Sequence, residues 1–201
     1  HECEIAQGNA CNHQDPAKYW MHNNMITING QKMGKSLGNF ITLQELFTGD
    51  HKLLEQAYSP MTVRFFMLQS QYRSTLDFSN EALKAAQKGY KRIANGLRII
   101  KGMEFEADNS QAIDAEQIAE IDAAIQGCYD GMNDDLNTAV TISHLFTLLK
   151  KINQLHTGQL TFSQLGQDVF DRMKTNYINL DHSFCFRNMK VNKLSISAEI
   201  H

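Results

Sequence analysis

Apolar and polar positions change their spacing once along the chain, from a short strand-like pattern to long helical ones. Near the N-terminus, two short segments, 25–28 and 31–33, flank the dipeptide Asn29-Gly30. This dipeptide tolerates the positive φ angles that a two-residue hairpin turn requires. The pattern therefore predicts a β-hairpin, and the residues that follow it leave from a rigid strand end.

Capping residues predict where the next two helices begin. Thr42, followed three residues later by Glu45, is typical of a capping box and predicts a helix that starts near Leu43. Ser59-Pro60 combines a capping hydroxyl with a residue suited to the first helical turn. We expect the second helix to pack through a face formed by Val63, Phe66, Met67 and Ser70.

From residue 79 onward, apolar residues recur at spacings of three and four, as expected for amphipathic helices. The stripes are Leu83, Ala86, Tyr90, Ile93, Leu97 and Ile100; Ile118, Ile121, Ile125 and Cys128; Ile142, Leu145, Leu149 and Ile152; and Val169, Phe170, Met173 and Tyr177. Asn137 can cap the third of these helices. Antiparallel packing is the simplest way to bury all four stripes, so the pattern predicts a helical bundle. The polar segment 104–111, with a turn-like centre at 108–110, is the expected linker or long loop.

Composition indicates a folded chain of one or two domains. Its 201 residues are 42% hydrophobic and include only 2 prolines, which suits an ordinary core. No run of about eighteen apolar residues occurs, and the N-terminus lacks a basic segment followed by an apolar one, so neither a membrane span nor a signal peptide is predicted. The 4 cysteines are irregularly spaced, which argues against a secreted disulfide framework and for a reducing cytoplasm.

The net charge of −3 conceals two oppositely charged regions. Six basic and no acidic residues lie between Lys84 and Lys101, whereas residues 104–135 hold ten acidic residues and no lysine or arginine. Basic residues 84, 88, 91 and 98 share one face of the predicted helix. Such a face either follows an RNA backbone or is simply solvated, and the sequence leaves both alternatives open.

The clearest chemistry lies in the segment directly after the predicted hairpin. Lys32 and Lys35 flank Gly34, which lets the backbone approach a ligand closely. Ser36 and Asn39 can hold the shape of the loop through hydrogen bonds. Two mobile ammonium groups on such a loop suit a triphosphate, because they can follow the charge that develops during phosphoryl chemistry. The alternative is a solvated surface turn.

Four short motifs resemble those of cysteinyl-tRNA synthetases, a family of class I aminoacyl-tRNA synthetases. They occur along the chain in the order that this family uses. Residues 31–40 resemble the KMSKS signature, with Gly34 where the family usually has serine. The other three motifs are His1–Gln7, Lys18–Asn23 and Tyr72–Ser74. The resemblance covers about residues 1–100, is weaker at 134–138, and is lost in the last twenty residues.

The resemblance implies a mainly α fold: the remnant of a Rossmann-type catalytic core, with a short β-hairpin and a KMSKS-type loop, followed by an α-helical bundle. We expect residues 1–78 to form the C-terminal part of the catalytic core, 79–180 a helical tRNA-binding bundle, and 181–201 a tail of unassigned structure. The family's HIGH motif and its first zinc cysteine would lie upstream of His1. The expectation is therefore a fragment that is inactive by itself.

The activity implied by the resemblance is that of a cysteine–tRNA ligase, which activates cysteine with ATP and magnesium and transfers it to tRNA(Cys). Lys32 and Lys35 would be catalytic and, together with Gly34 and Ser36, would bind ATP. Two alternatives remain open: a related ligase that joins cysteine to an amino sugar, and a non-catalytic helical module that binds RNA or protein. We expect a cytoplasmic monomer without membrane contact.

Six possible metal ligands lie within the first 22 residues: His1, Cys3, Glu4, Cys11, His13 and His22. Their spacing does not match a self-contained zinc site. The resemblance implies a zinc held by ligands from separate segments, with Glu4 as one ligand and His1 as a second candidate; the zinc would bind the sulfur of the substrate cysteine. Trp20 and His22 would form a wall of the cysteine pocket, the alternative being a buried aromatic and a surface histidine.

Overall fold

The computed structural model describes residues 1–106 and 112–184 and is mainly helical, with one small sheet, which confirms the predicted fold class. Its elements are α1 (Glu2–Asn12), β1 (Ile26–Ile28), β2 (Gln31–Lys32), a 3-10 turn (Lys35–Leu37), α2 (Leu43–Thr48), α3 (Pro60–Leu68), β3 (Leu76–Phe78), α4 (Asn80–Gly102), α5 (Ala115–Asn133), α6 (Thr138–His156), α7 (Phe162–Leu165) and α8 (Gln167–Ser183). The centre of the predicted linker, 108–110, and most of the predicted tail lie outside the described residues.

The predicted hairpin is present, and its first strand, β1, is the middle strand of the sheet. Asn29 and Gly30 adopt φ angles of 50° and 77°, as the two-residue turn requires. Strand β1 pairs antiparallel with β2 and parallel with β3, giving the strand order β2-β1-β3. Asp77 of β3 accepts hydrogen bonds from Thr27 Oγ1 at 2.6 Å and from the Gly30 amide at 2.7 Å. One carboxylate therefore fixes both the strand and the turn that lead to the lysine loop.

The two predicted capping motifs start helices α2 and α3. Thr42 Oγ1 accepts from the Glu45 amide, and the Glu45 carboxylate accepts from the Thr42 amide at 2.7 Å, which completes the capping box. Ser59 Oγ accepts from the Thr62 amide at the start of α3. These side chains satisfy amides that have no partner inside the helix.

The buried face of α3 differs from the predicted one at Met67, which is 42% exposed, whereas Phe65 is fully buried. The cause is the close packing of α3 on α4. A Cβ atom added at Gly89 of α4 would lie 2.9 Å from the Phe65 ring, so the glycine leaves the space that the ring occupies. The hydrophobic pattern of α3 alone carries no sign of this partner.

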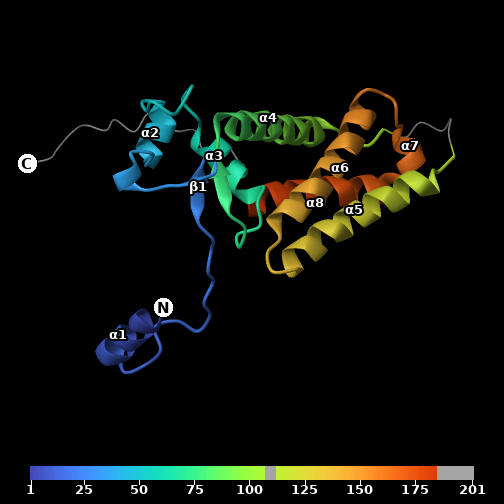
Figure 1. Ribbon diagram of the computed structural model, residues 1–201. Coiled ribbons are helices and arrows are strands. Elements are labelled where there is room, and N and C mark those ends of the chain that lie inside the picture. The colour runs from blue at the N-terminus through green and yellow to red at the C-terminus, as the bar shows by residue number, and fades with distance from the viewer. Residues whose placement is uncertain (107–111, 185–201) are drawn as a thin grey trace, which may run out of the picture.

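The predicted stripes of α4, α5, α6 and α8 pack together, as Figure 1 shows for the right-hand part of the molecule. Their buried side chains continue without a break into those of α3 and the sheet. At Gly96, an added Cβ would lie 2.2 Å from Leu149 Cδ1, so this glycine sets the approach of α4 to α6. Lys151 is only 2% exposed and donates from its ammonium to Gln117 and Glu120, which satisfies the buried charge.

Helix α1 differs from the bundle helices because none of its residues is buried. It lies apart from the rest of the molecule at the end of an extended segment (Figure 1). No helix of the described residues is both long and apolar enough to cross a membrane.

Candidate active site

The lysine loop, residues 32–40, is closed at its base by a single amide side chain. Asn39 Oδ1 accepts from the Gly34 amide at 2.9 Å, and Asn39 Nδ2 donates to the Lys32 carbonyl at 3.1 Å. Between them, the chain makes one 3-10 turn over Lys35–Leu37 and ends it at Gly38, whose φ is 65°. The loop therefore has a defined shape that presents its side chains outward. The prediction that Asn39 holds this shape through hydrogen bonds is confirmed.

Both lysines of the loop are free of carboxylate partners. Lys32, Lys35 and Ser36 are exposed, and neither ammonium takes part in an ion pair found among the described residues. Lys35 Nζ lies 5.5 Å from the centroid of the Phe40 ring. A cation–π contact orients the ammonium without neutralising its charge, so Lys35 keeps its positive charge available for an anion.

An apolar hollow of about 370 Å³ lies beside the lysine loop, which the sequence analysis did not predict. Its lining includes Ile26 of β1, Met33 and Phe40 of the lysine loop, Leu43 of α2 and Met67 of α3. Phe40 and Leu43 are 38% and 60% exposed. The sequence signal was the apolar residues that flank Thr42, Phe40 and Ile41 before it and Leu43 after it, which a solvated loop does not need.

The predicted metal and cysteine-pocket residues lie together in the N-terminal segment. His1 Nδ1 is 3.4 Å from Glu4 Oε1, and the rings of His1 and His22 are 4.4 Å apart between centroids. The Trp20 and His22 rings stack at 6.3 Å with 9° between their planes. Trp20 is 41% exposed, so it is not a buried core residue. The structure groups these four residues but does not bring them to the lysine loop (Figure 1).

The ligands present do not complete a zinc site. In the part of the chain that the structure describes, no group of three or more histidines, cysteines and carboxylates could hold a metal ion. His1 and Glu4 are two ligands, whereas zinc takes about four, of which the protein supplies at least three. Cys3 and Cys11 are exposed, and burial raises the pKa of the Cys128 thiol to about 12, which keeps it protonated and structural.

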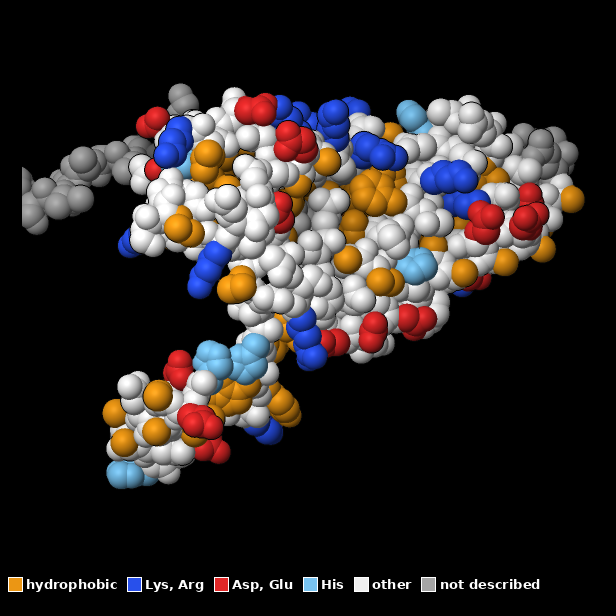
Figure 2. All heavy atoms as spheres, viewed as in Figure 1, with side chains coloured by type: hydrophobic (Ala, Val, Ile, Leu, Met, Phe, Trp, Pro, Cys, Tyr) orange, Lys and Arg blue, Asp and Glu red, His pale blue; other side chains and the backbone are white. Residues whose placement is uncertain are grey.

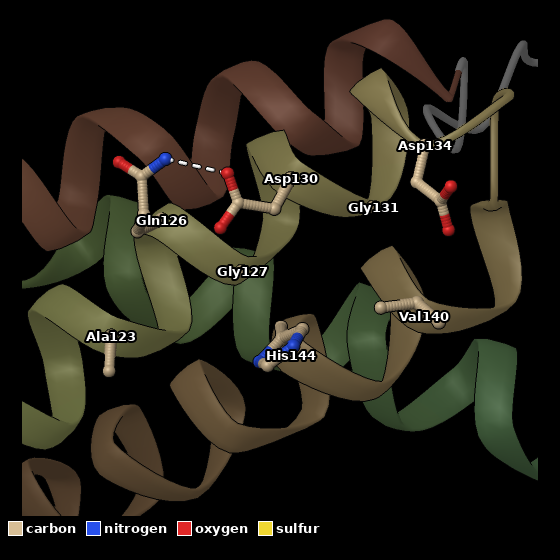
Figure 3. A pocket seen from close by; sticks show the side chains of 8 residues that line it. All are labelled: Ala123, Gln126, Gly127, Asp130, Gly131, Asp134, Val140 and His144. Atoms are coloured by element: carbon tan, nitrogen blue, oxygen red, sulfur yellow. Dashed lines mark hydrogen bonds between the residues drawn. The ribbon is translucent and has the colours of Figure 1, made fainter.

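A second hollow, of about 490 Å³, lies between α5 and α6 (Figure 3). It exists because Gly127 and Gly131 have no side chains: added Cβ atoms would lie 2.5 Å from the His144 ring and 2.7 Å from Thr141 Oγ1. Figure 3 shows Asp130 beside this hollow, accepting from Gln126 Nε2 at 2.8 Å. Its lining contains a histidine and two carboxylates but no cationic side chain, so it does not compete with the lysine loop for a nucleotide.

Two family models and one solved structure identify the class of protein to which this fold belongs. Residues 1–88 match the family model described as the tRNA synthetases class I (C) catalytic domain, and residues 128–179 match the DALR domain. A LeuRS chain from Agrobacterium radiobacter K84, solved in a ternary complex with tRNA and LeuAMS, superposes with a TM-score of 0.55 and 16% identity over 90% of this chain and 23% of its own length. The fold is that of a class I tRNA synthetase, from the catalytic domain to the DALR helices.

Curated relatives identify the family within this class. The cysteine–tRNA ligase of Cytophaga hutchinsonii is 58% identical over 185 residues, which cover 90% of this chain and 36% of that protein. The cysteine–tRNA ligase of Bacteroides thetaiotaomicron is 50% identical over 186 residues, or 92% of this chain and 35% of that protein. This chain belongs to the cysteine–tRNA ligase family, as the four motifs predicted. It spans about a third of the length of these relatives.

Proposed function

We propose that the protein to which this chain belongs ligates cysteine to tRNA(Cys). In the first step, the cysteine carboxylate attacks the α-phosphorus of ATP and pyrophosphate leaves, which forms cysteinyl adenylate. In the second step, a terminal ribose hydroxyl of the tRNA attacks the carbonyl carbon of the adenylate, and AMP leaves. The observation that carries the proposal is the lysine loop, in which two exposed, unpaired ammonium groups stand on a backbone fixed by Asn39.

The proposed roles of the loop residues follow from their positions. Lys35 contacts the departing pyrophosphate, since its ammonium is charged, exposed and oriented only by the Phe40 ring. Lys32 adds a second positive charge at the base of the loop. Ser36 offers a hydroxyl to the same phosphates, whereas the Gly34 amide is already bound to Asn39, so Gly34 contributes shape. Fixed positive groups of this kind stabilise charge that develops on the leaving phosphates.

The two proposed metals, magnesium and zinc, differ in what they require from the protein. Magnesium would accompany ATP as its counter-ion and needs no complete protein site. For zinc, we propose Glu4 and His1 as two contributing ligands, with Trp20 and His22 beside the substrate cysteine. Two ligands do not fit a complete zinc centre, so no step of the proposed reaction depends on the metal here.

The proposed tRNA partner is supported by the exposed face of α4. Lys88, Lys91 and Arg98 are exposed on the side of this helix that faces away from the core, and none of them pairs with a carboxylate in the described residues. In Figure 2, several basic side chains gather along the edge over α4, together with a few acidic ones, and more acidic side chains lie along the opposite edge near α5. Lys84, the fourth residue of the predicted basic face, is instead paired with Glu55. The three remaining cations suit the phosphates of an RNA backbone.

The function is tested by two assays on the native, full-length protein. Exchange of pyrophosphate into ATP that depends on cysteine, and not on serine, is the expected first result. Attachment of cysteine to tRNA(Cys) is the expected second result. Transfer to an amino sugar instead of tRNA would replace the proposed acceptor, and tRNA binding without any exchange would leave only a non-catalytic module. The names of the relatives do not favour either of these outcomes.

A further inference from the structure

Two segments that the sequence analysis singled out, 72–74 and 134–138, meet in the structure although they are separated by a long stretch of chain. Tyr72 Oη donates to Asp135 Oδ1 at 2.8 Å, across 63 positions of sequence. Arg73 Nε lies 3.0 Å from Asp135 Oδ2, and Gln71 Nε2 donates to the same oxygen at 3.4 Å. The carboxylate of Asp135 thus contacts the side chains of three consecutive residues. We call Gln71, Tyr72, Arg73 and Asp135 the Asp135 junction.

The backbone that presents this carboxylate is in an unfavourable conformation. Asp135 and Leu136 have φ angles of 52° and 54°, so two successive residues with a Cβ atom occupy the left-handed region. The Asn137 amide donates to the Gly131 carbonyl at 2.9 Å, which holds the loop against the end of α5. Strained backbone persists only where its surroundings require it, and here it directs Asp135 toward Tyr72.

A second bond attaches the start of α6 to the same region. Thr138 Oγ1 donates to the Leu68 carbonyl, at the end of α3, at 2.7 Å. Figure 1 shows the loop between α5 and α6 beside the segment that follows α3. The α5–α6 end of the bundle is therefore held at two points, by Asp135 and by Thr138.

The other side of the junction reaches the hairpin that carries the lysine loop. The Asn24 amide donates to the Tyr72 carbonyl at 3.1 Å, and Asn24 Nδ2 donates to the Arg73 carbonyl at 2.9 Å. Asn24 lies two residues before strand β1 and two residues after His22. Tyr72 and Arg73 therefore contact the start of the hairpin through their backbone and the bundle through their side chains.

The junction adds little to overall stability, because its ion pair is exposed. The Arg73 and Asp135 side chains are 66% and 44% exposed, and exposed pairs stabilise a fold only weakly. Because a strained loop supports an ion pair that adds so little stability, we infer that the pair serves to position the parts of the molecule that it joins.

We propose that the Asp135 junction fixes the orientation of the α5–α6 end of the bundle relative to the lysine hairpin, so that a tRNA held on the bundle presents its end to the activated cysteine. Asp135 is then a positioning residue for the transfer step. The inference rests on the proposed function, and it separates the two steps: activation does not need the bundle in register with the lysine hairpin, whereas transfer does.

Two conservative variants of the native, full-length protein test this role. Asp135→Asn removes the charge but keeps a residue that tolerates the left-handed conformation, and Tyr72→Phe removes only the hydroxyl donor. We expect each variant to keep cysteine-dependent pyrophosphate exchange within about twofold and to lose about tenfold in kcat/KM for tRNA charging. The double variant should lose no more than the worse single variant, because both substitutions weaken the same junction.

The matched control is Asp130→Asn, which changes an exposed carboxylate on α5 that, among the described residues, accepts a side-chain hydrogen bond only from Gln126 of its own helix. It should charge tRNA normally. The proposal is overturned if both junction variants charge tRNA as well as this control, or if exchange falls in equal proportion to charging. A protein whose unaltered form neither exchanges nor charges would instead refute the proposed function. Should Asp135→Asn fail to fold, Tyr72→Phe alone decides the question.

Discussion

The lysine loop and the helical bundle differ in how they place their side chains: the loop exposes them, and the bundle buries them. The loop exposes Lys32 and Lys35 and is held by one hairpin turn and the two hydrogen bonds of Asn39. The bundle buries side chains such as Phe170 and Tyr177, which are 1% and 0% exposed. Side chains that act on a ligand must remain unpaired, whereas side chains that hold a fold must be fully packed. The difference teaches that chemistry and stability are separable in this chain, and each prediction tests that separation.

The largest expected effect is on stability, from the bundle. Phe170 packs against Phe162 and Phe105, with ring centroids 5.1 and 6.1 Å away. Phe170→Ala removes this ring and leaves a cavity, which we expect to cost about 3–5 kcal/mol in the free energy of unfolding. Urea denaturation measures the change. Leu37→Ala, at a 62% exposed site of the lysine loop, is the control and should shift stability by less than about 0.5 kcal/mol. Equal losses would erase the contrast between the two regions.

The second effect is on chemistry, from the loop. Lys35→Ala should lower the rate of cysteine-dependent pyrophosphate exchange by about 100- to 1,000-fold, the usual loss when one preorganised charge-stabilising group is removed. The melting temperature should stay unchanged because Lys35 is exposed. Lys52→Ala, an exposed lysine in another loop, is the control and should exchange normally. Near-normal exchange in Lys35→Ala would remove the lysine loop from the reaction.

Local signals in the sequence were sufficient for the elements on both sides of this comparison. Asn29-Gly30 determines its own turn, and Thr42 with Glu45 determines its own helix start, because the interacting groups are within a few residues. The bundle stripes could be read from spacing alone, since any partner buries an apolar face. The four motifs added the family, which the relatives confirm.

Long-range pairings could not be predicted in the same way. Strand β3 has three residues and exists because it pairs with β1, about fifty positions earlier in the chain. Phe65 is buried because Gly89 leaves room for it, and Asp135 meets Tyr72 across 63 positions of sequence. Helix α1 was also missed, because no apolar stripe marks it. The roles of the site residues and the division at residue 78 stay predictions.

The third effect concerns tRNA affinity and should be moderate. Lys88→Ala with Lys91→Ala removes two cations from the exposed face of α4. We expect the dependence of log affinity on log salt to become shallower by about one to two, since each phosphate contact releases counterions. Lys52→Ala is the control, an exposed lysine of another segment. Filter binding at several salt concentrations measures both. An unchanged slope would make the basic face a solvated surface and leave the bundle without an RNA-binding role.

The smallest expected effect is a pH dependence at the edge of the lysine loop. The pKa of Glu45 is lowered, first by the hydrogen bond from the Thr42 amide and then by the Thr42 hydroxyl. Because the folded pKa lies below the unfolded one, this stabilisation is complete above about pH 4.3, the ordinary value for glutamate, and is lost as pH falls through the folded pKa.

In Glu45→Gln, the amide oxygen can still accept from Thr42, so α2 should form but without this titration. We expect NMR amide shifts of Thr42 to move as the pH falls below about 4.3 in the unaltered protein and to stay constant in the variant, while the amides of α8 report no such step in either. If the Thr42 amide titrates equally in both proteins, the capping box does not control the end of the lysine loop. The loop would then depend on Asn39 and the hairpin for its shape.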